Sequence, residues 1–397
     1  MLKPVRVLLV TKSTGGVAEY VRQLISGLDL EGFSLTVACL SENGPEFAAE
    51  LARHAGVRAF SLKMNRYKVD PFSDMRVLLA LAAHLRKEKY DLVHAHASKP
   101  GFLTRLAAVG TGTPVLFSPH CFAFHAGTGA ISARVIAALE GLAARYLTTR
   151  IVLVADGERE LARRYGVGFD ELFVTVHTGI DIQKYGISFD RTALKLSLAI
   201  PENARLVCSV GRLSAQKAPL DFVRMAAIIN SQQPGVHFAW IGGGPLEESA
   251  RALSAELGLR EVLHFAGYRT DIPEILQAAD CFVLPSLWEG FPIVLLEAMA
   301  AGAPVVATDI PGNTDAIRSG VDGWLVSVKN PQALAKAVLD VLNNPDLAKA
   351  FRENSKRRVE QEFTRQTMLE RLAELYMLIA SKRSLKIPQS ISPKGIV

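Results

Sequence analysis

Two glutamates, Glu289 and Glu297, lie eight positions apart in a segment whose pattern suits the binding of a hydroxyl-rich ligand. The segment follows residues 281–284, a short apolar run typical of a buried strand. Pro292 lies between the two glutamates and is suited to the first position of a helix, where its missing N–H removes no hydrogen bond. The pattern therefore predicts Glu289 on a loop at the end of a strand and Glu297 on the helix that follows.

The surroundings of Glu297 indicate what this helix could bind. Its neighbours within residues 295–299 are apolar, and an unpaired carboxylate is costly in such a place. The vicinal hydroxyls of a ribose would offer it hydrogen-bond donors, and the amides at the start of the helix would favour a diphosphate. The alternative interpretation is structural: Glu289 caps the helix and Glu297 pairs with a buried cation.

A second group of residues follows the strand-like segment 205–210 and consists of Gly211, Arg212 and Lys217. Arg212 and Lys217 are five positions apart across a turn, so both could reach a diphosphate leaving group. A guanidinium offers a planar fork to phosphate oxygens, and an ammonium offers a point charge. The alternative is two solvated loop cations.

Two features of the first half also follow predicted strands. Gly15 and Gly16 come after residues 5–10 and would let the backbone approach a ligand closely, although an ordinary tight turn fits the same pattern. They belong to neither a P-loop nor a GxGxxG fingerprint. His120 comes after residues 115–118, where a histidine is either packed or directed at a ligand.

The segment Glu-Gly-Phe-Pro-Ile-Val-Leu-Leu-Glu-Ala, residues 289–298, resembles the signature of the retaining glycosyltransferases of the GT-B fold, in the group called family 4. The resemblance extends over nearly the whole chain, from Gly16 to the last helical segment. It implies that Glu289 contacts hydroxyls of the donor sugar and that Glu297 holds the nucleotide ribose. Glycine is commoner in the family at the position of Pro292, so one amide donor to the sugar or phosphate is missing here.

The same resemblance assigns roles to the other candidates. The segment from Gly211 to Lys217 becomes a pyrophosphate grip, Gly16 lies against the donor sugar and phosphate, and His120 is directed at the sugar. Tyr268 and Arg269 occupy the place where the family contacts the base. The expected donor-binding residues are Gly15, Gly16, Gly211, Arg212, Lys217, Tyr268, Arg269, Glu289, Gly290, Phe291, Pro292, Ile293, Val294 and Glu297, and the expected catalytic residues are His120, Arg212, Lys217 and Glu289.

Other histidines and aromatic residues surround His120 in the sequence. His94 and His96 share one face of a predicted strand at a spacing found in metal sites, but no acidic or cysteine partner is apparent. They are interpreted as structural or supporting residues, with metal binding as the alternative. Phe122, Phe124 and His125 are predicted to shape the entrance for the acceptor.

The elements that must position these residues are alternating strands and helices. Short apolar runs are separated by longer segments with helical spacing, from residues 5–10 to 174–178, and the series begins again at 205–211. This alternation predicts α/β domains with parallel sheets covered on both faces. Ligands of such sheets bind outside the carboxyl ends of the strands, so two facing sheets would form one composite site in a cleft between two Rossmann-like domains.

The predicted domain boundary lies near residues 182–200. Residues 1–182 are expected to form an acceptor-binding Rossmann-like domain and residues 183–366 a nucleotide-sugar-binding one. Residues 367–380 are predicted to form a closing helix that packs back on the first domain, and residues 381–397 a disordered basic tail.

Composition narrows the class of protein. A chain of 397 residues with 49% apolar and 21% charged residues fits two globular domains. The four cysteines are scattered and form no CxxC motif, which favours reduced thiols in the cytoplasm. The first residues run directly into a strand, without room for a signal peptide, and the longest apolar stretch, 290–308, is broken by prolines and a glutamate, so no membrane-spanning helix is expected.

The net charge of +6 is spread among acidic residues, with no aromatic and basic platform for nucleic acid. An anionic substrate or an anionic membrane surface accounts for the charge at least as well. Basic helical segments such as 84–87 could place the protein peripherally on the inner face of the cytoplasmic membrane.

The resemblance implies transfer of a hexosyl unit from a nucleotide-diphosphate sugar to a saccharide or lipid-linked acceptor in envelope or exopolysaccharide assembly. Transfer with retention would need no protein nucleophile, no cofactor and no metal if Arg212 and Lys217 stabilise the leaving diphosphate. Two alternatives stay open at this point: a nucleotide-sugar epimerase of the same architecture, and a non-catalytic protein that binds sugar nucleotides.

Overall fold

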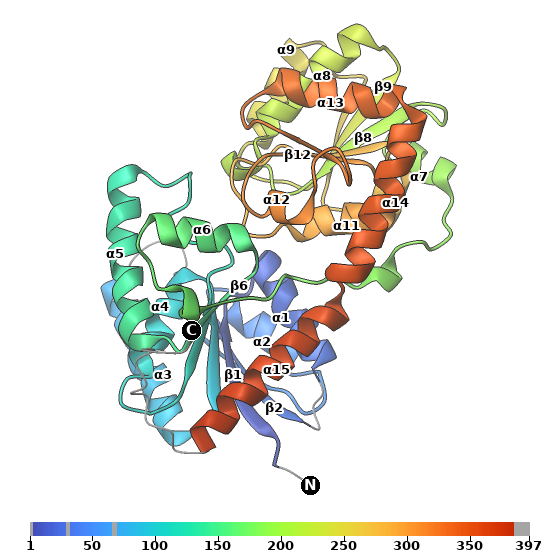
Figure 1. Ribbon diagram of the computed structural model, residues 1–397. Coiled ribbons are helices and arrows are strands. Elements are labelled where there is room, and N and C mark those ends of the chain that lie inside the picture. The colour runs from blue at the N-terminus through green and yellow to red at the C-terminus, as the bar shows by residue number, and fades with distance from the viewer. Residues whose placement is uncertain (1–2, 29–31, 66–69, 385–397) are drawn as a thin grey trace, which may run out of the picture.

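The chain forms two α/β domains, each built on a fully parallel sheet (Figure 1). The computed structural model describes residues 3–28, 32–65 and 70–384. The first sheet has the order β3-β2-β1-β4-β5-β6-β7. Its strands are β1 (Val5–Thr11), β2 (Phe33–Leu40), β3 (Arg58–Leu62), β4 (Leu92–His96), β5 (Val115–Ser118), β6 (Arg150–Leu153) and β7 (Phe173–Thr175).

The central strands of this sheet are apolar on both faces, as parallel strands covered by helices must be. In β1, Val7 and Leu9 belong to one buried cluster, and Leu8 and Val10 belong to another on the opposite face. The helices up to the second sheet are α1 (Gly16–Gly27), α2 (Gly44–Leu51), α3 (Pro71–Lys87), α4 (Ser98–Ala107), α5 (Ala130–Leu147), α6 (Asp156–Arg164) and α7 (Arg191–Ser197), with short 3-10 turns at Asp170–Leu172 and Ile182–Lys184.

The second sheet has the order β10-β9-β8-β11-β12-β13. Its strands are β8 (Arg205–Val210), β9 (Val236–Ile241), β10 (Leu263–Gly267), β11 (Cys281–Leu284), β12 (Val305–Thr308) and β13 (Trp324–Val326). The remaining helices are α8 (Pro219–Gln232), α9 (Glu247–Glu256), α10 (Ile272–Ala278), α11 (Ile293–Ala301), α12 (Asn313–Ala316), α13 (Pro331–Asn343), α14 (Pro345–Glu362) and α15 (Arg365–Ser384), and a 3-10 turn covers Ala215–Lys217.

Both sheets reverse their strand order at one point, between β1 and β4 in the first and between β8 and β11 in the second. Loops that leave neighbouring strands in opposite directions open a crevice at such a point. The loops after β1, β8 and β11 carry Gly16, Lys217 and Glu289, so the topology brings the main candidate residues to these two places.

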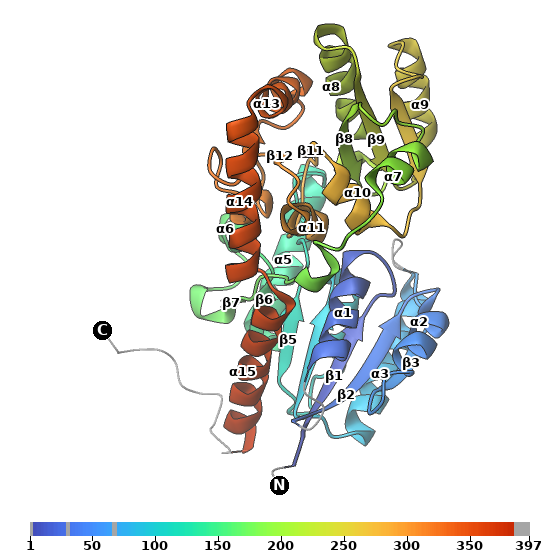
Figure 2. The same ribbon diagram turned by 90° about the vertical axis from the view of Figure 1, so that its right-hand side faces the viewer.

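The last helix returns to the first domain. Helix α15 packs against α1, β1 and β4, and Figure 2 shows α1 and α15 side by side below α11. The hydroxyl of Tyr376 on α15 lies 2.6 Å from Nδ1 of His94 on β4. The chain thus crosses between the domains twice, and Ile180 of the first crossing pairs with Thr364 of the second.

Some element limits differ from the sequence prediction. The sequence predicts Pro292 at the first helical position, but it is extended and α11 begins at Ile293. The closing helix is longer than the predicted 367–380, and residues 381–384 of the predicted disordered tail belong to it. The rest of the tail lies outside the described residues. In the described part of the chain, no helix has the length and apolar character needed to cross a bilayer.

Candidate active site

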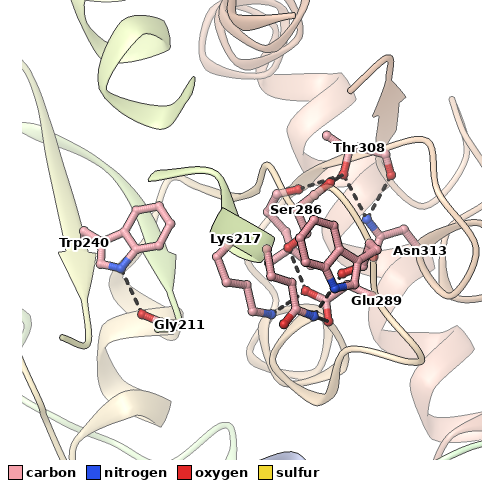
Figure 3. A network of polar contacts seen from close by, with 10 residues as sticks. Gly211, Lys217, Trp240, Ser286, Glu289, Thr308 and Asn313 are labelled. Carbon is pink, nitrogen blue, oxygen red and sulfur yellow. Dashed lines mark hydrogen bonds and ion pairs between the residues drawn. The ribbon is translucent and has the colours of Figure 1, made fainter. Parts of the chain in front are cut away.

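Lys217 and Glu289 meet where the loops after β8 and β11 come together (Figure 3). The Nζ atom of Lys217 lies 2.5 Å from Oε1 of Glu289, and the two side chains are only 16% and 8% exposed. Ser286 Oγ also donates to Oε1 at 2.7 Å, and Gln216 Nε2 donates to Oε2 at 3.2 Å. The carboxylate is therefore held by one cation and two neutral donors.

A chain of buried hydrogen bonds fixes the loop behind Glu289 (Figure 3). The carbonyl of Ser286 accepts from Thr308 Oγ1 at 2.5 Å, and the carbonyl of Thr308 accepts from Asn313 Nδ2 at 2.8 Å. All three residues are buried. Thr308 and Asn313 were not predicted as part of the site; the signal for Thr308 was a polar residue at the carboxyl end of an apolar strand.

Gly211 brings its loop alongside the stem of Lys217. A Cβ atom on Gly211 would lie 3.4 Å from Cε of Lys217, and the Gly211 carbonyl accepts from Nε1 of Trp240 at 2.9 Å (Figure 3). Arg212, the next residue, is exposed. Lys217 thus points into the protein toward Glu289, and Arg212 lies at the surface of the same loop.

The loop after β11 also packs onto the first domain. An ideal Cβ on Gly290 would stand 2.9 Å from the backbone nitrogen of Cys121 and 3.0 Å from the carbonyl oxygen of His120, so only glycine fits there. Trp288 stacks on the ring of His125, with centroids 4.8 Å apart and planes 12° from parallel. The structure therefore brings His120 to the segment that carries Glu289.

His120 is held in an unusual backbone conformation with φ of 53°. Its Nε2 lies 3.0 Å from Nδ1 of His96, and its ring and that of Tyr20 form a T-shaped pair. Burial, with contributions from His96 and Lys12, keeps the pKa of His120 well below its ordinary value. The imidazole is therefore neutral near pH 7 and acts as a hydrogen-bonding group.

His94 and His96 support this arrangement from β4. Both nitrogens of His94 have hydroxyl partners, Tyr376 at 2.6 Å and Ser118 at 2.9 Å. Burial lowers the pKa of His96 to about 3. These contacts agree with the structural interpretation of the pair.

Glu297 lies about one turn into α11 and faces the chain crossing and the first domain. Tyr185, which sequence analysis missed, interacts with its carboxyl group. Burial raises the pKa of Glu297, and the nearby Glu19 of α1 raises it further, whereas Tyr185 lowers it. At the start of α11, Ile293 Cδ1 would lie 3.7 Å from a Cβ on Gly16, so the glycine loop after β1 adjoins this helix.

The structure contradicts the alternative interpretation of the two glutamates, in which Glu289 caps the helix and Glu297 pairs with a buried cation. The described hydrogen bonds of the Glu289 carboxylate go to Lys217, Ser286 and Gln216 and not to the first turn of α11, so Glu289 does not cap this helix. Glu297 lies against Tyr185, and the nearby Lys184 is exposed, so its partner is not a buried cation.

Several predicted positions lie elsewhere. Phe122 and Phe124 are each 1% exposed and stack on one another in the core beneath α5, so the prediction that they shape an entrance is wrong. Phe291 packs on His177 and Phe363, while Val294 is partly buried in the same core.

Tyr268 and Arg269 differ from one another in their surroundings. Tyr268 is 85% exposed, and its ring lies beside Gly243. Arg269 forms an ion pair with Asp271 at 2.6 Å and donates to Ser197 Oγ at 3.0 Å. Arg269 is thereby tied to α7 rather than to the group around Lys217.

Glu158 is a buried carboxyl group that sequence analysis also missed. Its oxygens accept from the backbone nitrogens of Cys121 at 2.6 Å and Val154 at 3.2 Å. Burial raises its pKa to about 7. It fixes the backbone directly after His120, and no sequence pattern marked it.

Two family patterns match the chain, one on each domain. The family described as glycosyl transferases group 1 matches residues 190–358, and the glycosyl transferase 4-like domain matches residues 15–176. The first match contains Lys217 and Glu289, and the second contains Gly16 and His120.

Similar proteins include the Escherichia coli UDP-Gal:alpha-D-GlcNAc-diphosphoundecaprenol alpha-1,3-galactosyltransferase, which is 31% identical over 375 residues, covering 91% of this chain and 93% of that protein. The D-inositol 3-phosphate glycosyltransferase of Streptomyces scabiei is 31% identical over 289 residues, covering 68% of this chain and 64% of its own length. The crystal structure of Anabaena Alr3699/HepE in complex with UDP and glucose superposes with a TM-score of 0.80 at 21% identity, over 94% of this chain and 100% of that one.

Proposed function

This chain belongs to the group 1 glycosyltransferases and has the GT-B fold predicted from its sequence, and on that premise we propose that it transfers a hexosyl unit from a nucleoside-diphosphate sugar to a saccharide or lipid-linked acceptor. The observation that carries the proposal is the pairing of Lys217 with Glu289 at 2.5 Å, beside the start of α11. The pair thereby places two groups together. Lys217 is a cation that can bind a diphosphate, and Glu289 is a carboxylate that can bind sugar hydroxyls.

In this proposal the diphosphate binds between the Lys217 loop and the start of α11. Lys217 and the exposed Arg212 supply positive charge, and the first amides of α11 supply hydrogen-bond donors. Because Pro292 has no N–H, the amides available begin at Ile293. Lys217 would exchange its carboxylate partner for a phosphate oxygen when the donor enters.

Glu289 would then accept hydrogen bonds from hydroxyls of the donor sugar. Ser286 and Gln216 continue to hold the carboxylate after Lys217 turns to the phosphate, so it stays in place. Glu297, on the next turns of α11, would hold the ribose hydroxyls, a role that suits a buried carboxyl group with Tyr185 as its only described side-chain hydrogen-bond partner.

We propose transfer with retention of configuration. The C1–O bond to the diphosphate breaks as positive charge develops on the sugar, the acceptor hydroxyl attacks from the same face, and its proton passes to the leaving phosphate. Lys217 and Arg212 stabilise the charge that develops on the diphosphate. The neutral His120 would hydrogen-bond the sugar from the first domain, and the cationic side chains make a metal ion unnecessary in this scheme.

The proposed setting is the assembly of envelope or extracellular polysaccharide at the inner face of the cytoplasmic membrane. It is supported by the Escherichia coli relative, whose name specifies a diphosphoundecaprenol acceptor. A protein that uses such an acceptor must work at a membrane surface.

A donor screen tests the proposal. Purified protein is incubated with UDP-, GDP- and ADP-sugars, with and without lipid extract, and release of nucleoside diphosphate is followed in buffer containing EDTA. We expect acceptor-dependent release with one donor, a product of retained anomeric configuration by NMR, and no effect of EDTA. Conversion of the donor to its epimer, or tight binding without turnover, would instead assign the chain to the epimerase or the non-catalytic alternative.

A further inference from the structure

Helix α5 carries a row of large apolar side chains that no other element of the described structure covers. Ile131, Val135, Leu139, Leu142 and Tyr146 are between 49% and 79% exposed. At 3.6 residues per turn, these five positions fall within an arc of about 80° on one side of the helix. They form a continuous stripe along the whole helix.

The opposite side of α5 faces the first domain. Ala133, Ala137 and Ala144 are buried there against the sheet. Glu140, the only acidic residue of the helix, is also buried and forms a two-point ion pair with the buried Arg105, at 2.5 and 2.9 Å. The exposed charges of α5 are therefore Arg134 and Arg145, and both are positive.

Helix α3 repeats this combination on the same side of the first domain. Phe72, Met75 and Leu79 are 52–87% exposed, and Arg76 and Arg86 are exposed beside them. Helix α4 packs between α3 and α5 and ends near the exposed Val109. Figure 1 shows the three helices together on the side of the domain away from α1 and α15.

We propose that the outward side of α3 and α5 is a docking surface for an anionic lipid bilayer. Exposed apolar residues in this number mark an interaction surface, and a helix with apolar and basic residues outward lies in the interface between headgroups and acyl chains. The charge pattern favours lipid of negative charge. The anionic headgroups would meet four exposed arginines, Arg76, Arg86, Arg134 and Arg145, whereas Glu140 of α5 is turned inward to Arg105.

The surface adjoins the candidate site. Helix α5 follows directly from the loop that carries His120 and His125, so the end of the stripe at Ile131 is the end nearest the site. Seated on a bilayer, the first domain would receive a lipid-linked acceptor from the side. This last step rests on the proposed function, but the docking surface does not.

Vesicle sedimentation tests the surface without turnover. The full chain is mixed with vesicles of phosphatidylcholine alone, or of equal parts phosphatidylcholine and phosphatidylglycerol, and pelleted. We expect binding to the anionic vesicles at least about tenfold stronger than to the neutral ones. V135E/L142E should lose this binding by about tenfold or more, and R134Q/R145Q should lose the preference for anionic lipid.

The matched control is L196E, an exposed leucine on α7 of the second domain, which should bind vesicles as the wild type does. Donor turnover with a short water-soluble acceptor should be unchanged in V135E/L142E, so a failure of docking is distinguished from a failure of catalysis. Equal vesicle binding by wild type and V135E/L142E would overturn the proposal. A wild-type protein that does not bind anionic vesicles would also overturn it. The same holds if this non-binding wild type forms a dimer, measured by light scattering, that V135E/L142E dissociates.

Discussion

At the residue scale, Lys217 has a carboxylate partner in the chain and needs a phosphate partner in the proposed reaction. Its ion pair with Glu289 is shielded from water on most sides, so exchanging one anion for another keeps the ammonium paired throughout. A lysine suits this exchange because its charge is compact and its stem flexible. Glu289 keeps Ser286 and Gln216 as partners, which makes Lys217 the mobile member of the pair.

Replacing Lys217 with methionine removes the charge and keeps the length of the stem. We expect the turnover number for donor cleavage to fall by about 10²–10³-fold, as when one preorganised group that stabilises a developing negative charge is lost. Steady-state release of nucleoside diphosphate measures it. Lys349→Met, at an exposed lysine of α14, is the control. Near-wild-type turnover in a K217M/R212A double variant would show that neither cation stabilises the leaving diphosphate.

Glu158 gives the protein a predictable response to pH. Burial raises its pKa from 4.5 to about 7, so between these values the folded chain holds a proton that the unfolded chain has lost. Its contribution to stability is present in full below pH 4.5 and is lost as pH rises through 7. We expect wild type to lose about 2.5 kcal/mol relative to Glu158→Gln between pH 5 and 8 in urea unfolding. Parallel pH profiles for the two proteins would show that Glu158 titrates normally.

At the element scale, the contacts of α15 with the first domain include one buried polar pair in an otherwise apolar interface. Tyr376 and His94 are both inaccessible to solvent, and their hydrogen bond joins α15 to β4. Tyr376→Phe leaves His94 Nδ1 without a partner, so we expect the free energy of unfolding to fall by about 1–3 kcal/mol. Met377→Ala, at the exposed next position of the helix, should change it by about 0.5 kcal/mol or less. Equal effects of the two changes in urea unfolding would mean that the bond contributes nothing.

Elements were predictable where a pattern is local. The apolar run at 281–284 is β11 with the same limits, because an apolar run bounded by turn residues specifies a buried strand. The start of α11 was misplaced by one residue because Pro292 suits both the first helical position and the extended residue before it. The end of α15 was missed because no glycine or proline before residue 388 stops the helix.

The candidate site was predictable in its members and not in its contacts. Lys217, Glu289 and His120 each follow an apolar strand, so sequence places them at the carboxyl edges of sheets. The pairing of Lys217 with Glu289 depends on the paths of two loops, because the two residues are 72 positions apart in the sequence. Tyr185 lies in a connection without periodicity, and its meeting with Glu297 is decided by how the two domains are joined.

At the scale of the whole molecule, the two domains are joined by two crossings that lie side by side. The backbone nitrogen of Ile180 donates to the carbonyl of Phe363 at 2.9 Å, and the nitrogen of Arg365 donates to the carbonyl of Ile180 at 2.8 Å. Asp181 and Arg365 add an ion pair at the same point. Since the two crossings are paired at this one place, a change in the angle between the domains needs rotation about few bonds, which suits closure around a donor.

Gly179 allows this close approach. An ideal Cβ there would lie 2.2 Å from the carbonyl oxygen of Thr364 and 2.7 Å from the nitrogen of Arg365, both of them backbone atoms that cannot turn aside. Gly179→Ala must therefore separate the crossings and weaken the bonds of Ile180, at a cost of about 2–4 kcal/mol in unfolding free energy. Gly129→Ala, where a Cβ meets nothing within 4 Å, is the matched control. Urea unfolding measures the loss, and small-angle scattering with and without nucleoside diphosphate follows the angle between the domains. If G179A matched G129A in stability and in its scattering response, the paired crossings would not be what holds the two halves of the site in register.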